Sequence, residues 1–287
     1  MTQFISTTLN GITLGAVYFL VASGFTLIFG LMRVVNLAHG SLYLLGAYIC
    51  WDITDKTGNW YLGAIGAALV AASAGLLMQQ GMLRRIQGQD LRAALVTIGV
   101  SIIAADLLLW YYGGDFKDLS PPETISGGMN LHVANVFYPT FRLVALALAV
   151  VVGVGLWLLL RYTRLGMIIR AGIDDRAMVS ALGINVQRTF AIVFALGGFL
   201  AGLGGVMGAS INSVGPGDDG VYLLNSLIVV IIGGMGSLVG TAIGALLIGL
   251  VEQYGLAYAP TYSYLVTFAL MILVLAFRPQ GMFGRPA

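Results

Sequence analysis

Charged residues are scarce in this chain: they make up 9% of its 287 residues, while 59% are hydrophobic. A soluble domain of this size could not bury so much apolar surface, so the composition excludes a soluble fold. The single cysteine, Cys50, excludes an internal disulfide framework and any metal cluster built from cysteines. The net charge of +2 is small and scattered, which argues against nucleic-acid binding.

Motifs for catalysis are also missing. Neither Lys56 nor Lys117 follows a glycine, so the chain has no GxxxxGK[ST] phosphate loop and is not expected to hydrolyse ATP. No serine lies in a nucleophile-elbow context. His39 and His132 are too far apart in sequence to suggest a metal site. We therefore expect no enzyme, no metal and no cofactor. The first ten residues carry no basic side chain, which predicts a retained first span rather than a cleaved signal peptide.

Long apolar runs are abundant and predict an all-α polytopic membrane protein that forms one transmembrane domain, residues 1–287. At about 20 residues a span, the runs allow eight or nine crossings. The expected spans are 9–31, 34–51, 61–81, 93–112, 140–160, 189–212, a longer run at 223–253, and 263–277. The run 223–253 is too short for two full spans, so we expect two half-helices that meet at its glycines.

Basic residues predict the orientation, because short cytoplasmic loops are rich in lysine and arginine. If the loop 161–188 is cytoplasmic, three basic residues lie outside, namely Lys56, Lys117 and Arg142. The inner set is Arg33, Arg84, Arg85, Arg92, Arg161, Arg164, Arg170, Arg176, Arg188, Arg278 and Arg285. This excess places the N-terminus outside and the C-terminus in the cytoplasm. The long loop 113–139 is then external, where it could receive a partner or be a disordered tether.

Two interruptions of the apolar pattern are candidates for a substrate pathway. Broken backbone at membrane depth is tolerated where protein or a water-filled cavity satisfies it, and paired interruptions in two halves point to a transport route. The candidate pathway residues are Asn36, His39, Gly40, Ser41, Gly233, Gly234, Gly236 and Ser237. We expect the two breaks to meet near the membrane centre. A structural hydrogen bond to a carbonyl is the favoured role for His39.

Other glycines and the embedded charges have simpler interpretations. Glycines spaced four apart, as in Gly198xxxGly202, Gly204xxxGly208 and Gly236xxxGly240xxxGly244, are expected to pack transmembrane helices closely. Asp106 and Glu252 are costly in a membrane without a partner. Arg142 could pair with either carboxylate or reach the outer surface.

The most charged stretch, 161–188, predicts a short helix on an aqueous face. Asp174 or Asp175 can cap its start, and Gly183 supplies a left-handed end. The helix would carry an apolar stripe of Met178, Val179 and Leu182, which suits docking into a groove of another protein. An ordinary positively charged cytoplasmic loop is the alternative.

Several motifs resemble the permeases of branched-chain amino-acid ABC importers, and most of all the LivH-type subunit. The resemblance covers the full length and is carried by Val34-Val35-Asn36-Leu37-Ala38-His39-Gly40, Leu45-Gly46-Ala47-Tyr48, Arg170-Ala171, Asp174-Asp175, Leu182-Gly183-Ile184-Asn185, Ile232-Gly233-Gly234-Met235-Gly236-Ser237, and Arg278-Pro279-Gln280-Gly281-Met282-Phe283-Gly284-Arg285. Two positions depart from the family. Ser41 stands where many relatives have an acidic residue, and Val179 where alanine is common.

The resemblance implies an all-helical permease of the bacterial inner membrane. Its partners would be a homologous second permease or a second copy, two cytoplasmic ATPases and an external solute-binding protein. The ATPase-coupling residues would be Arg170, Asp174, Asp175, Arg176, Met178, Val179, Leu182 and Gly183. The solute would be a branched-chain or another amino acid. Urea or another small amide or carboxylate solute is an alternative. An ion-coupled carrier or channel acting alone is a second one.

Overall fold

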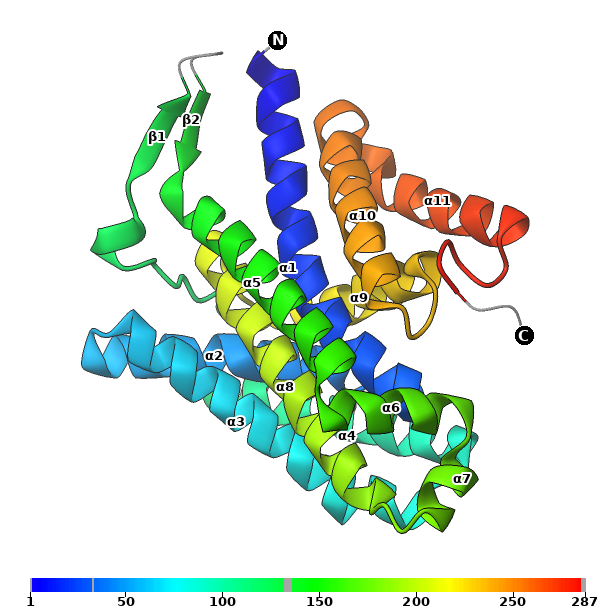
Figure 1. Ribbon diagram of the computed structural model, residues 1–287. Coiled ribbons are helices and arrows are strands. Elements are labelled where there is room, and N and C mark those ends of the chain that lie inside the picture. Colours follow the sequence, from blue (N-terminus) through cyan, green and yellow to red (C-terminus); the bar gives the residue numbers. More distant parts are fainter. Residues whose placement is uncertain (1, 33, 132–135, 285–287) are drawn as a thin grey trace.

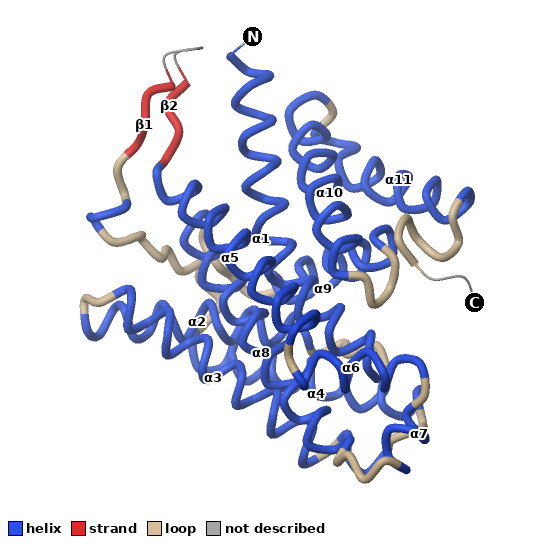
Figure 2. The backbone as a smooth tube through the Cα atoms, viewed as in Figure 1, coloured by secondary structure: helices blue, strands red, loops and turns tan. Residues whose placement is uncertain are grey.

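The computed structural model describes residues 2–32, 34–131 and 136–284, and helices make up almost all of this part (Figures 1 and 2). The α-helices are α1 (Thr2–Met32), α2 (His39–Thr57), α3 (Trp60–Gly81), α4 (Asp90–Tyr112), α5 (Thr140–Tyr162), α6 (Arg164–Asp174), α7 (Arg176–Ala181), α8 (Val186–Ile211), α9 (Asp218–Gly233), α10 (Leu238–Tyr258) and α11 (Ser263–Phe277). Short 3₁₀ turns lie at Leu83–Ile86, Glu123–Ile125 and Pro260–Tyr262. Three residues with roles in the sequence analysis, Arg33, His132 and Arg285, lie outside the described residues.

Among the described residues, seven helical stretches are long and apolar enough to cross a membrane: α1, α4, α5, α8, α10, α3 together with the turn Leu83–Ile86, and α11 together with the turn Pro260–Tyr262. α2 and α9 pack among them, and α9 has 16 residues, fewer than the about 20 that a full span needs. The predicted all-α polytopic fold is therefore confirmed. The expectation of two half-helices in 223–253 holds for α9 but is wrong for α10, because α10 has 21 residues and is itself long and apolar enough to span a membrane.

α1 is the central helix of the bundle. In its most apolar stretch 83% of the residues are buried, against 17% for α4 and α5 and 11% for α11. Thr26 of α1 and Thr241 of α10 share a hydrogen bond of 2.6 Å between their hydroxyl groups. α1 therefore belongs to the protein core, whereas α4, α5 and α11 present broad outer faces. Figure 1 shows α11 at the edge of the bundle.

Glycines pack the central helices closely, as the sequence predicts. A side chain on Gly202 would approach the Ala71 methyl group of α3 to 2.7 Å, and one on Gly205 would clash with the Tyr43 carbonyl of α2. Gly15 of α1 lies equally tightly against Ala245 of α10. Small residues at these crossings let backbones approach in a way that larger residues would prevent.

The chain breaks between α9 and α10 at the predicted glycines. Gly234 and Gly236 have φ angles of 100° and 85°, which glycine adopts without strain. The Ser237 side chain then caps α10 by accepting from the Gly240 N–H. The segment after α11 satisfies the open end of α9, because the Met282 and Phe283 N–H groups donate to the Ile232 and Gly233 carbonyls at 2.8 and 3.0 Å.

The second helix begins later in the chain than the predicted span 34–51. α1 continues to Met32, residues 34–38 are not helical, and α2 then runs from His39 to Thr57. The hydroxyl of Thr97 in α4 accepts the Leu37 N–H at 3.1 Å and supports the non-helical backbone. The predicted span therefore begins too early, because its apolar residues continue through this turn.

The loop 113–139 is folded in its described part, which contradicts the alternative of a disordered tether. Strands β1 (Gly128–Leu131) and β2 (Val136–Pro139) pair antiparallel, with Gly128 opposite Pro139. Lys117 also exchanges two backbone hydrogen bonds with Val214. The loop is thereby fixed to the end of α8.

Candidate functional site

Two features stand out at opposite ends of the bundle: the helix pair α6–α7, and a polar cavity near the β-hairpin. Figure 1 shows α6 and α7 projecting at one end, while the N-terminus and the hairpin lie at the other. The two interruptions of the apolar pattern lie between these ends.

α6 is an amphipathic helix that the sequence analysis did not separate from the rest of the loop. Thr163 caps it by accepting the Gly166 N–H at 3.1 Å. Ile169 is buried, and a side chain on Gly172 would meet the Leu31 methyl group at 3.0 Å. α6 therefore rests on the end of α1, the central helix.

α7 has the start and end that the sequence predicts. Of the two candidate caps, Asp174 ends α6 and Asp175 caps α7, where its carboxylate accepts the Met178 N–H at 3.0 Å. The end is closed by the Leu182 and Gly183 N–H groups, which donate to the Met178 and Ser180 carbonyls. Gly183 has a φ of 77°, in the left-handed region.

The predicted apolar stripe of α7 is wrong in one member. Met178 and Leu182 are 59% and 72% exposed, but Val179 is 3% exposed. Val179 follows Met178 directly, so it points about 100° around the helix and packs inward. Arg170 and Arg188 are both exposed. The surface around α7 thus exposes two large apolar side chains, with Arg170 of α6 and Arg188 of α8 nearby in sequence. The described part of the chain leaves these side chains uncovered.

At the first break, the side chains stabilise a non-helical turn. His39 is fully buried, and its Nε2 lies 2.9 Å from the Val21 carbonyl, so the predicted structural hydrogen bond is confirmed. Asn36 accepts the Ala38 N–H at 3.2 Å through its side chain. The hydroxyl groups of Ser41 and Ser101 are 2.9 Å apart.

The structure does not bring Gly40 of the first break and Gly234 of the second together. Gly40 packs against the Asp219 carbonyl in the first turn of α9. Gly234 lies beyond the other end of α9, against the Gly284 backbone. The 14 residues between Asp219 and Gly233 separate these points by about 21 Å along the helix. Gly236, by contrast, lies beside Gly30 in the last turns of α1, where a Cβ atom on Gly236 would be 3.4 Å from the Gly30 Cα atom. Gly40 and Gly234 are thus separated by α9, while the meeting of the two breaks near the membrane centre stays a prediction.

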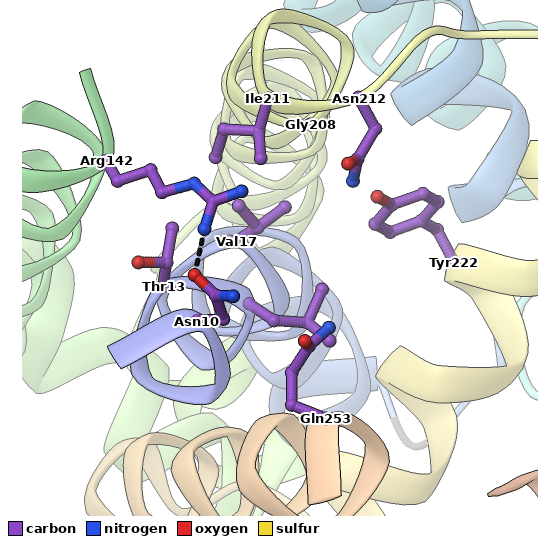
Figure 3. A pocket seen from close by; sticks show the side chains of 10 residues that line it. Asn10, Thr13, Val17, Arg142, Gly208, Ile211, Asn212, Tyr222 and Gln253 are labelled. Carbon is purple, nitrogen blue, oxygen red and sulfur yellow. Dashed lines mark hydrogen bonds between the residues drawn. The ribbon is translucent and has the colours of Figure 1, made fainter. Parts of the chain in front are cut away.

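The polar cavity has a volume of about 160 Å³ and lies between α1, α5, α8, α9 and α10 (Figure 3). This volume is several times the about 30 Å³ that one water molecule occupies in the liquid. Its lining is Asn10, Thr13, Leu14, Val17, Arg142, Gly208, Ile211, Asn212, Tyr222 and Gln253. Sequence analysis missed this site, since its residues come from five separate helices and their ends.

Arg142 is held by neutral groups in this cavity. Its guanidinium donates to the Asn10 side-chain oxygen, as the dashed line in Figure 3 shows, and lies 5.9 Å from the centre of the Tyr138 ring. Tyr138 is itself fixed to α1, because its hydroxyl bonds with the Thr13 hydroxyl and donates to the Leu9 carbonyl. Among the described residues, the structure contains one ion pair, which joins Lys56 and Asp52.

The two carboxylates expected within the membrane, Glu252 and Asp106, do not bind Arg142. Glu252 accepts from the Tyr18 hydroxyl at 2.6 Å, and the Asn225 amide donates to the same hydroxyl at 2.6 Å. Asp106 is exposed on α4. Arg142 therefore pairs with neither carboxylate, contrary to one of the two interpretations from the sequence.

Several known permease proteins are similar to this chain, among them the ribose import permease protein RbsC of Escherichia coli, which is 28% identical over 89% of this chain and 79% of that protein. Residues 7–275 match the family described as "Branched-chain amino acid transport system / permease component". The chain is 31% identical to LivH of Escherichia coli over 99% of this chain and 96% of that protein. It is 30% identical to BraD of Pseudomonas aeruginosa over 99% and 97% of the two chains. LivM of Escherichia coli is 26% identical over 94% and 68%. LivH, BraD and LivM are named high-affinity branched-chain amino acid transport system permease proteins. No solved structure matches the chain.

Proposed function

This chain belongs to the family of branched-chain amino acid transport permeases, and from that premise we propose that α7 couples it to the ATPases of an ABC importer. The chain is a multi-pass membrane permease subunit, in agreement with its seven apolar helices. ATP hydrolysis belongs to partner subunits in this proposal, with the permease contributing half of the translocation pathway.

The observation that carries the coupling proposal is the exposure of Met178 and Leu182 on a capped helix. Burial of a large apolar side chain typically stabilises a contact by about 1.5–3 kcal/mol. Arg170, Arg176 and Arg188 would add polar contacts at the rim, which orient more than they bind. Movement of α7 would pass through α6 to the end of α1, where Gly172 lies against Leu31.

The orientation that fits this role has α6, α7 and the C-terminus in the cytoplasm and the N-terminus outside. Its support is the excess of basic residues in the loops on the α7 side. The β-hairpin and the polar cavity then face outward, where a solute-binding protein would deliver its ligand. The localisation would be the bacterial inner membrane.

A second permease is the expected partner within the membrane. The chain is similar to both LivH and LivM, two differently named permease proteins of Escherichia coli. The outer faces of α4, α5 and α11 leave room for a homologue or a second copy. The exposed carboxylate of Asp106 on α4 favours a protein neighbour there, because lipid would not solvate its charge.

The solute proposed from the relatives' names is a branched-chain or another amino acid, with urea or another small amide or carboxylate as the alternative. We retain both backbone breaks as candidate parts of the route. Asn36, His39, Gly40 and Ser41 would contribute at one end of α9. Gly233, Gly234, Gly236 and Ser237 would contribute at the other. An ion-coupled carrier acting alone does not fit a member of this family.

The test combines ATPase retention with uptake. In the double variant Met178→Asp and Leu182→Asp, the ATPase subunits should be lost from a detergent pull-down and uptake into vesicles should stop. Met129→Asp is the matched control for ATPase retention, because Met129 is 55% exposed but lies on the hairpin at the other end of the molecule. Normal ATPase retention and normal uptake in the double variant would show that α7 is not the coupling helix.

A further inference from the structure

We propose that the polar cavity around Arg142 is a recognition site for the carboxylate group of the transported solute. This inference rests on the proposed function, and it favours the solutes that carry a carboxylate over urea and other small amides.

Within the described part of the chain, the Arg142 guanidinium has no anionic partner, and it lies at a polar cavity. One of its N–H groups is used by Asn10, and the Tyr138 ring lies beside the guanidinium. A guanidinium has five N–H donors in a planar fork that matches the two oxygens of a carboxylate. The unused donors therefore form a preorganised anion site, whose own orientation is fixed through Asn10 and Tyr138.

Neighbouring carboxylates are engaged with other groups and do not neutralise this site. Glu252, on α10 beside the cavity residue Gln253, accepts from Tyr18. Asp218, at the start of α9, accepts the Gly215 N–H at 2.9 Å. Neither residue lines the cavity, so the positive charge of Arg142 is left for a solute.

The rest of the lining suits the other parts of a small amphiphilic solute. Leu14, Val17 and Ile211 supply apolar surface, and Figure 3 shows Ile211 and Val17 between Arg142 and Tyr222. Tyr222 is held in place because its ring stacks on the Tyr43 ring at 3.9 Å between centroids. A molecule with a carboxylate at one end and an apolar group beside it would contact both kinds of surface, whereas urea would leave Arg142 unpaired.

The experiment uses the assembled importer in nanodiscs with Gln253→Cys in the cavity. The native cysteine, Cys50, is buried and should contribute little labelling. We compare the labelling rates of a negatively charged sulfonatoethyl and a positively charged trimethylammonioethyl methanethiosulfonate. The negative reagent should react faster, and addition of Arg142→Gln should abolish this preference. Asp118→Cys, in the loop before the hairpin, is the control site that Arg142→Gln should not change.

Protection by unlabelled molecules then tests the solute class. Leucine and 4-methylpentanoate should slow the labelling, and leucinamide, which lacks the carboxylate, should not. Arg142→Gln should raise the protecting concentration of leucine by roughly tenfold to a hundredfold, the range expected for a charge-assisted hydrogen bond. Arg142→Lys should keep the charge preference but protect less well, because lysine lacks the planar fork.

Three results would overturn the proposal: no charge preference in the parent, the same preference after Arg142→Gln, or equal protection by leucine and leucinamide. Failure of both carboxylate probes to protect would overturn it too. ATPase copurification is measured in the same samples. A defect in coupling would alter that measurement and leave the charge preference unchanged, so the two proposals fail separately.

Discussion

Replacement of Gly183, at the end of α7, should weaken binding of the ATPase subunit through backbone strain alone. Gly183 has a φ of 77°, and nothing lies within 4 Å of the position that a Cβ atom would occupy. A non-glycine residue in the left-handed conformation costs about 1–2 kcal/mol. We expect α7 of the free variant to open and relieve this strain, so that the docked state alone bears it. The affinity of Gly183→Val for the ATPase should therefore fall by a factor of about 5 to 30.

Asparagine provides the matched control, because it tolerates the left-handed region far better than valine. Gly183→Asn should bind the ATPase almost as well as the parent. Asp175→Ala, which removes the cap on Met178 N–H, should cost about 1 kcal/mol and fall between the two. The measurement is titration of labelled ATPase onto the permease pair in nanodiscs. Parent-like binding by Gly183→Val, or equal loss in Gly183→Asn, would refute the reasoning from backbone strain.

The remaining predictions concern orientation and the α9–α10 break. A cysteine introduced at position 118 should react with an impermeant reagent in intact cells, and one at position 176 should not. The reason is that the basic loops are expected in the cytoplasm. The reverse labelling pattern would contradict the topology. Gly234→Leu should stop uptake but not membrane insertion, since its φ is 100° and its side chain would clash with Gly284. Gly99→Leu is the control for the uptake assay, because a Cβ atom at position 99 would meet nothing within 4 Å. Parent-like uptake by Gly234→Leu would mean that the break has no part in transport.

Local signals were sufficient for the parts of the fold that depend on backbone chemistry. The glycine run predicted the break at Gly234 and Gly236, because those positions need φ angles that other residues avoid. A carboxylate before a short helix and a glycine after it predicted the limits of α7 at Asp175 and Gly183. Each of these signals lies within a few residues of the structure that it specifies.

Features that depend on long-range packing could not be predicted in this way. Arg142 and Asn10 are 132 residues apart in sequence, and no local pattern relates them to each other. Met178 and Val179 are equally apolar, yet tertiary packing buries one of them and exposes the other. The distance between Gly40 and Gly234 likewise depends on α9 lying between them. For these features the sequence supplies candidates, and the arrangement of helices selects among them.

The contact between the segment after α11 and the end of α9 has a consequence for biosynthesis. Ile232 and Gly233 leave the ribosome well before Met282 and Phe283, whose N–H groups bond to their carbonyls. Until α10 and α11 have been synthesised, the end of α9 lacks these donors, and open carbonyls are unfavourable in lipid. The break between α9 and α10 should therefore be completed late, after the other helices have inserted. A nascent chain arrested before Arg278 would keep this part of the bundle unfinished and accessible to chaperones or proteases.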